Sequence, residues 1–209
     1  MKILVFGASR GVGIQVVEQA LQAGHSVTAF MRTQPTFGLQ HPNLTVFQGD
    51  SMDMAAVEEA IAGQNAVIAA LGPTRPPVPG MMEISAKNIV AGMVKHSVRR
   101  LLSTTGAGVR QPEDRPKLAD HVIGFLLRLM VKDVVLDSAA NVKVIQNSDL
   151  EWTIARFPRL LDGEHTGKYR VGYVSKDSSA QFSRADAADF LLKELNEKKW
   201  VRKLPLVSY

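Results

Sequence analysis

A glycine-rich stretch near the start of the chain carries the clearest chemistry in the sequence. Residues 2–13 read KILVFGASRGVG, so an apolar run leads directly into three glycines. Glycines at such a turn let the amides of the following helix approach the phosphates of a dinucleotide. Gly7 would turn the chain off the strand, Gly11 would admit the pyrophosphate, and Gly13 would let helix and strand pack closely. We expect a dinucleotide site formed by Gly7, Ser9, Arg10, Gly11, Val12 and Gly13, and the alternative is a tight turn without a ligand.

Two arginines indicate which dinucleotide this site would hold. The apolar run 26–31 is followed by Arg32, where proteins that select NAD usually carry an acidic residue for the ribose hydroxyls. Arg10 lies inside the glycine loop, and two planar guanidinium groups suit a single phosphate group. We expect Arg10 and Arg32 to bind the 2′-phosphate of NADPH, so that NADPH is preferred to NADH. The alternative is that both arginines are solvated surface charges.

The glycine motif lies within a regular alternation of apolar runs and helical patterns. Strand-like runs occupy residues 2–6, 26–31, 44–48, 65–71, 100–104 and 151–156. Helical periodicity is found at 12–23, 53–62, 81–97 and 184–197, and a last strand at 204–207 is expected at an edge of the sheet. Near-continuous apolar strands imply a sheet covered by helices on both faces. The expected fold is an α/β, Rossmann-type, doubly wound parallel sheet in a single domain over residues 1–209.

Composition excludes several classes of site and partner. The 209 residues include no cysteine, which excludes disulfides, thiolate nucleophiles and cysteine-bound metals, and the five histidines lack the spacing of metal ligands. An uninterrupted apolar window of about 18 residues is absent, and the start of the chain has no secretory pattern, so we expect a cytoplasmic protein without a membrane partner. The net charge of +5 comes from scattered residues. We expect no nucleic-acid partner, and a nucleic-acid-binding module remains the alternative.

Beyond the glycine motif, the sequence resembles a known family along nearly its whole length. The ordered motifs are KILVFGASRGVG, FQGDSMD, NAVIAALG, SAKNIV, RRLLSTTGA, SDLEWTIARFP and FSRADAADFLL. In this order and spacing they resemble the atypical short-chain dehydrogenase/reductases of the NmrA-like and biliverdin reductase B (flavin reductase) type. The resemblance implies a Rossmann fold, a nicotinamide cofactor and a reductase, or, for the NmrA-like relatives, a redox sensor that binds NADP without turnover.

The resemblance also implies roles for residues that follow the later strands. Asp50 would contact the adenine, with Ser51 and Met52 beside the ring. The motif after the fourth strand would place Ala70, Leu71 and Gly72 against the ribose and pyrophosphate. Near the nicotinamide, the resemblance places Ser103, Thr104, Thr105, Phe157 and Pro158, with Arg159 at the mouth to attract an acidic substrate. Simpler roles are a turn acid for Asp50 and strand-end caps for the hydroxyl residues.

Two departures from family patterns narrow the chemistry. The loop has the GxxxGxG spacing of the tyrosine-dependent short-chain dehydrogenases, whereas the resembled family commonly has GxxGxxG. Yet Val134 and Ser138 stand where the catalytic Tyr and Lys would align. We therefore expect hydride transfer from NADPH to a planar acceptor, such as a flavin, quinone or linear tetrapyrrole, which needs no strong enzyme acid. Ser103, Thr104 and Thr105 are candidates for a lesser catalytic role.

Three other segments invite an interpretation. The loops 72–80 and 106–117 follow two strand ends and are expected to form walls of the site. The apolar segment 121–136 is too short to span a bilayer, and it fits core packing, a substrate lid or a dimer surface. The sequence is compatible with a monomer or a homodimer.

Overall fold

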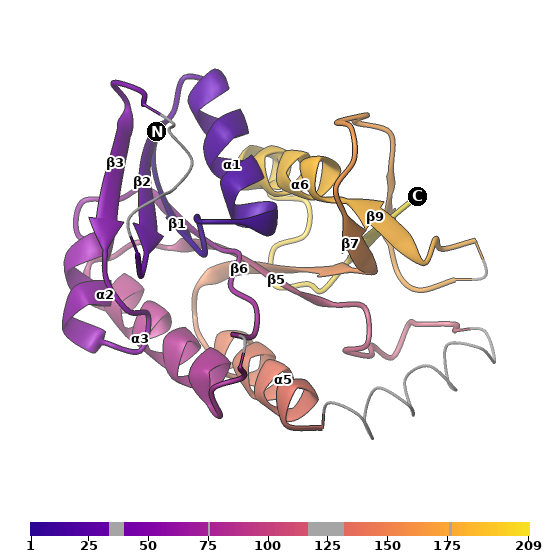
Figure 1. Ribbon diagram of the computed structural model, residues 1–209. Coiled ribbons are helices and arrows are strands. Elements are labelled where there is room, and N and C mark those ends of the chain that lie inside the picture. The colour runs from indigo at the N-terminus through magenta and orange to yellow at the C-terminus, as the bar shows by residue number, and fades with distance from the viewer. Residues whose placement is uncertain (34–39, 75, 117–131, 176) are drawn as a thin grey trace.

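A sheet of eight strands organises the computed structural model, which describes residues 1–33, 40–74, 76–116, 132–175 and 177–209 (Figure 1). The strand order is β3-β2-β1-β4-β5-β6-β10-β8, with β8 antiparallel to β10 and the other neighbours parallel. The strands are β1 (Lys2–Phe6), β2 (Ser26–Met31), β3 (Leu44–Gln48), β4 (Ala66–Ala69), β5 (Arg100–Gly106), β6 (Glu151–Phe157), β8 (Arg170–Gly172) and β10 (Leu206–Ser208). A second, two-stranded parallel sheet joins β7 (Arg159–Leu161) to β9 (Gln181–Ser183).

Helices cover both faces of the main sheet, as Figure 1 shows. The helices α1 (Gly11–Gln22) and α6 (Arg184–Glu197) lie on one face, and α2 (Met54–Ile61), α3 (Met81–Lys95) and α5 (Lys132–Gln146) lie on the other. Successive residues of a strand point to opposite faces. Ile3 and Val5 of β1 therefore join the core under α1 and α6, whereas Leu4 and Phe6 join the core under α2 and α3. This arrangement confirms the expected doubly wound, Rossmann-type α/β fold.

Most expected elements are present, with a few changes at their ends. The helix predicted at 184–197 has those limits in α6, whereas β4 ends at Ala69 because Ala70 and Leu71 turn into the loop that follows. The prediction that 204–207 forms an edge strand is wrong, since β8 pairs with the outer side of β10. Of the apolar segment 121–136, residues 121–131 lie outside the described residues, and the rest begins α5. Among the described helices, none has the length and apolar character needed to cross a membrane.

The polar loop after β5 is held against β6 by a buried ion pair. Arg156 of β6 donates to Asp114 through two nitrogens, at 2.6 Å and 2.9 Å, and the two side chains are 0% and 2% exposed. Arg156 also donates to the carbonyl oxygens of Val109 and Leu204, so the buried guanidinium is well satisfied. The described residues of this loop thus lie against β6, and the expectation that 106–117 lines the site does not hold for them.

Hydrogen bonds keep the Asp114 carboxylate ionised. Burial alone would raise the pKa of Asp114, but hydrogen bonds from Arg156 and from the amides of Gln111 and Val174 outweigh burial and hold this pKa below its usual value. A carboxyl whose pKa is lower in the folded chain stabilises the fold at neutral pH, and that contribution is lost as the pH falls through the folded pKa.

We expect Asp114→Asn to lower the free energy of unfolding by about 3 kcal/mol at pH 7, because it leaves Arg156 buried without its anion. The difference from the wild type should shrink as the pH falls below the ordinary carboxyl pKa of about 4, where Asp114 itself becomes protonated. Urea unfolding at a series of pH values measures this. Glu113→Gln, at the exposed neighbouring position, is the matched control and should change little. A loss that stays constant down to pH 2 would contradict this account.

Candidate functional site

A cleft of about 450 Å³ opens at the carboxyl ends of the strands. It lies where the strand order reverses between β1 and β4, the position at which open α/β sheets bind ligands. Its volume is within the range usual for small-molecule sites. The lining residues are Gly7, Ser9, Arg10, Gly11, Val12, Phe30, Met31, Arg32, Gly49, Asp50, Ser51, Met52, Ala70, Leu71, Gly72, Thr74, Val78, Met81, Thr104, Leu160 and Arg184.

The glycine loop brings β1, α1 and β4 into close contact at the floor of this cleft. Gly7 has φ +75°, and a Cβ there would lie 2.5 Å from the carbonyl oxygen of Ala70. A Cβ at Gly13 would lie 2.1 Å from the carbonyl oxygen of Gly7, so Gly13 packs behind the loop instead of lining the cleft. At Gly11, by contrast, a Cβ would have its nearest neighbour at 3.8 Å, which leaves the backbone open to a ligand.

The first turn of α1 has no anion of its own. Asp53 and Ser183 accept hydrogen bonds from the first-turn amides of α2 and α6, which caps these helices. The N-cap of α1 is Arg10, whose side chain makes no cap hydrogen bond, and the first turn contains no acidic residue. Helix N-termini carry unpaired amides and a partial positive charge. The α1 amides beside the cleft are therefore suited to a phosphate group.

The adenosine-side residues expected from the sequence come together in the cleft, with two differences in detail. Arg10 and Arg32 both line it, and both are exposed. Asp50 lines it too, while its Oδ1 accepts a hydrogen bond from the amide of Met52 at 2.9 Å, as a turn acid does. The Ser51 hydroxyl shares a 2.8 Å hydrogen bond with Ser85 of α3, so its side chain holds the loop to the helix.

Aromatic packing shapes this end of the cleft, and sequence reasoning missed it. Phe30 lines the cleft and stacks on Phe47 at a centroid distance of 5.4 Å. A Cβ at Gly49 would lie 2.8 Å from the Phe30 ring, so the glycine makes room for it. The predicted residues Arg32 and Asp50 follow closely on Phe30, Met31 and Gly49 in the sequence. Their position at the carboxyl ends of two strands could have identified these three residues as part of the cleft lining.

The loop after β4 forms the wall expected of it. Ala70, Leu71 and Gly72 line the cleft, and Thr74, Val78 and Met81 continue this wall towards α3. Asp137 of α5 caps α3 by accepting hydrogen bonds from the amides of Met82 and Glu83, both at 3.0 Å. The wall thus continues into α3, which hydrogen bonds hold against α5, and these contacts fix its position.

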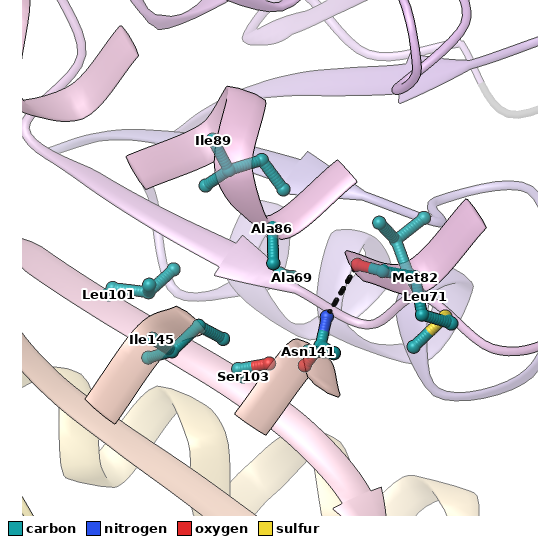
Figure 2. A pocket seen from close by; sticks show the side chains of 9 residues that line it. All are labelled: Ala69, Leu71, Met82, Ala86, Ile89, Leu101, Ser103, Asn141 and Ile145. Carbon is teal, nitrogen blue, oxygen red and sulfur yellow. Dashed lines mark hydrogen bonds between the residues drawn. The ribbon is translucent and has the colours of Figure 1, made fainter. Parts of the chain in front are cut away.

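The three hydroxyl residues at the end of β5 separate between two faces. Thr104 lines the cleft, whereas Ser103 is buried on the opposite side of the strand, and Thr105 follows the same alternation as Ser103. Ser103 borders a small cavity of about 10 Å³ between the sheet and helices α3 and α5, room for about one water molecule. Figure 2 shows Ser103 in this cavity near Asn141, whose amide donates to the carbonyl oxygen of Met82 at 3.0 Å.

The residues expected at the nicotinamide end occupy varied positions. Phe157 is buried and stacks on Phe182 at 5.8 Å, and Pro158 follows it. Arg159 begins β7 and is exposed, while the next residue, Leu160, lines the cleft. Arg184, at the start of α6, also lines the cleft.

Tyrosine side chains are engaged elsewhere. The Tyr169 hydroxyl donates to Asp189 at 2.6 Å, and burial together with this carboxylate raises the pKa of Tyr169. The Tyr209 hydroxyl donates to Asp186 at 2.7 Å. Tyr173 packs edge-on against Trp200. Within the described ranges, the cleft lining contains no tyrosine, and His, Asp and Glu do not gather in groups of three or more that could hold a metal ion.

Comparisons with known proteins agree with this geometry. YwnB of Bacillus subtilis (strain 168), an uncharacterized protein, is 26% identical over 213 residues, which cover 93% of this chain and 92% of YwnB. A short-chain dehydrogenase/reductase from Veillonella parvula DSM 2008, solved in complex with NADP, has a TM-score of 0.83 at 18% identity, covering 100% of this chain and 94% of that chain. ChuY from Escherichia coli O157:H7, an anaerobillin reductase, has a TM-score of 0.75 at 21% identity, covering 100% and 97%.

The two structural similarities, at 18% and 21% identity, show a shared fold. Family membership comes from the sequence itself, because residues 7–198 match the model of a family described as NAD(P)H-binding. The match includes the glycine loop and every strand from β2 to β9. It confirms the resemblance to NAD(P)-binding proteins stated for the sequence, and the chain belongs to the NAD(P)H-binding family.

Proposed function

We propose that this protein is an NADPH-dependent reductase that delivers hydride to a planar acceptor of the flavin, quinone or linear tetrapyrrole kind. The observation that carries the proposal is the composition of the cleft, which Arg10 and Arg32 line together with the uncapped start of α1. A carboxylate in place of Arg32 would repel a 2′-phosphate, whereas guanidinium groups bind it through charge and paired hydrogen bonds.

The geometry of the glycine loop fits the pyrophosphate part of such a cofactor. The open space at Gly11 and the free amides of α1 meet the two needs of a diphosphate, close backbone approach and hydrogen-bond donors. The NADP complex of the structurally similar Veillonella protein supports this choice of nucleotide.

The acceptor class follows from what the cleft offers to a reacting group. When bound, a reduced nicotinamide supplies a hydride, and the anion formed on the acceptor takes its proton from water. Thr104 presents a hydroxyl at the carboxyl end of β5, and Leu71, Val78, Met81 and Leu160 provide apolar surface for a flat ring. Such chemistry relies on the orientation of the acceptor ring against the nicotinamide more than on an acid of shifted pKa. The anaerobillin reductase activity named for ChuY is consistent with an acceptor of the tetrapyrrole kind.

Cofactor preference tests the role of the arginines. At equal concentrations, NADPH should raise the melting temperature of the wild type more than NADH, because a ligand that binds the folded state stabilises it by an amount that grows with the logarithm of its affinity. Arg32→Asp should reverse the order, with NADPH affinity falling at least tenfold, or about 1.4 kcal/mol. Arg170→Asp, at an exposed position of β8 outside the cleft lining, is the control and should keep the wild-type preference. Equal shifts for the two nucleotides in the wild type would contradict the proposal.

Turnover tests the reaction class. We expect steady NADPH consumption, followed at 340 nm, when FMN or a quinone is added. Thr104→Val should lower kcat by less than about 100-fold, since loss of a true general acid costs about 10²–10⁴-fold. Thr105→Val, one residue along β5 on the other face, should leave kcat unchanged. If the protein bound NADPH but did not oxidise it with any planar acceptor tested, the result would instead favour a redox sensor.

A further inference from the structure

Arg184 brings a third guanidinium into the cleft, from an element far along the chain. It is the first residue of α6, and its Nε lies 3.8 Å from the position that a Cβ on Gly11 would take. Gly11 begins α1, so this nitrogen lies beside the first-turn amides that have no cap. Arg10 and Arg32, by contrast, follow β1 and β2, and the proposed function assigns them to the adenosine side of the cleft.

Arg184 has a partner that a ligand can replace. Its Nη1 donates to Oδ1 of Asp162 at 2.6 Å, but the Asp162 side chain is 98% exposed and that of Arg184 is 30% exposed. Exposed ion pairs contribute little to stability because water and salt screen them. An anion that other groups hold in the cleft can therefore replace Asp162 as the partner of the Arg184 guanidinium at a small cost in free energy.

Building on the proposed NADPH function, we propose that Arg184 binds the pyrophosphate of the dinucleotide and that Asp162 competes for the same guanidinium when the nucleotide is absent. The charges in the cleft favour this role. Among the described lining residues the acidic one is Asp50, which follows β3 on the adenosine side. Near Gly11 and Arg184, the helix terminus and the guanidinium are both positive, and a diphosphate matches them because it accepts from both.

The proposal predicts opposite effects for the two partners of the ion pair. Arg184→Gln should weaken NADPH binding about tenfold, measured by calorimetry at moderate salt. Asp162→Asn should strengthen it two- to fivefold, because it releases Arg184. An ion pair with only a structural role would predict that both substitutions act in the same direction. In the Arg184→Gln background, Asp162→Asn should not change the affinity for NADPH. An equal gain in affinity there would mean that removing the Asp162 charge acts independently of Arg184, and it would overturn the proposed competition.

A truncated ligand and a matched control locate the contact. Adenosine 2′-monophosphate lacks the pyrophosphate, so Arg184→Gln should leave its affinity unchanged. Arg170→Gln, at an exposed position of β8 outside the cleft lining, should leave the affinity for both ligands unchanged. The melting temperature without ligand checks that each variant is folded, and Asp162→Asn changes an almost fully exposed side chain.

The outcomes separate this inference from the proposed function. Wild-type protein that binds NADPH, together with Arg184→Gln that binds it equally well, would overturn the role of Arg184 and leave the function intact. If Arg184→Gln kept its NADPH affinity and raised the KM for FMN, the residue would belong to the acceptor site, and the pyrophosphate assignment would be wrong. Wild-type protein that binds no NADPH would overturn both.

Discussion

The site depends on how closely the backbone approaches itself where β1 turns into α1. Gly13 packs against the carbonyl oxygen of Gly7, and Gly7 packs against that of Ala70, with no room for a side chain at either contact. These contacts bring the start of α1 to the carboxyl ends of β1 and β4. Because Arg10 does not cap the helix, the first-turn amides of α1 remain available at the floor of the cleft. A surface suited to a phosphate group results from packing that any larger residue would disrupt.

Positive groups around this surface come from three separate elements. Arg10 comes from the glycine loop, Arg32 from the end of β2, and Arg184 from the start of α6. The sheet brings them to one cleft, since parallel strands place their carboxyl ends on the same edge. Elsewhere, buried arginines are matched by buried acids, as Arg100 is by Glu194 and Arg156 by Asp114. The cleft differs because Arg10 and Arg32 are exposed and Arg184 is paired with an exposed acid, Asp162, so an anionic ligand can complete or replace their interactions.

The sequence predicted the parts of the fold and site that depend on local pattern. The apolar runs and glycine spacing located β1, α1 and β2, and the end of the second apolar run located Arg32, whereas the family resemblance located Asp50 and Ala70. Contacts between distant segments were beyond such reasoning. Arg184 lies next to Gly11 only because α6 packs beside α1, and the loop after β5 turns away from the cleft only because Arg156 is buried in β6 and binds Asp114. The short β8 adds to the sheet beyond β10 through antiparallel pairing, which no periodicity in three residues could indicate.

We propose that a diphosphate binds the free amides of α1 while guanidinium groups bind the phosphate on the adenosine ribose. A crystal structure of the protein with NADPH tests it most directly. We expect pyrophosphate oxygens within hydrogen-bond distance of the amides of Gly11 and Val12, and the 2′-phosphate between Arg10 and Arg32. Clear density for the nucleotide at another surface, or a 2′-phosphate that points to solvent away from both arginines, would contradict it.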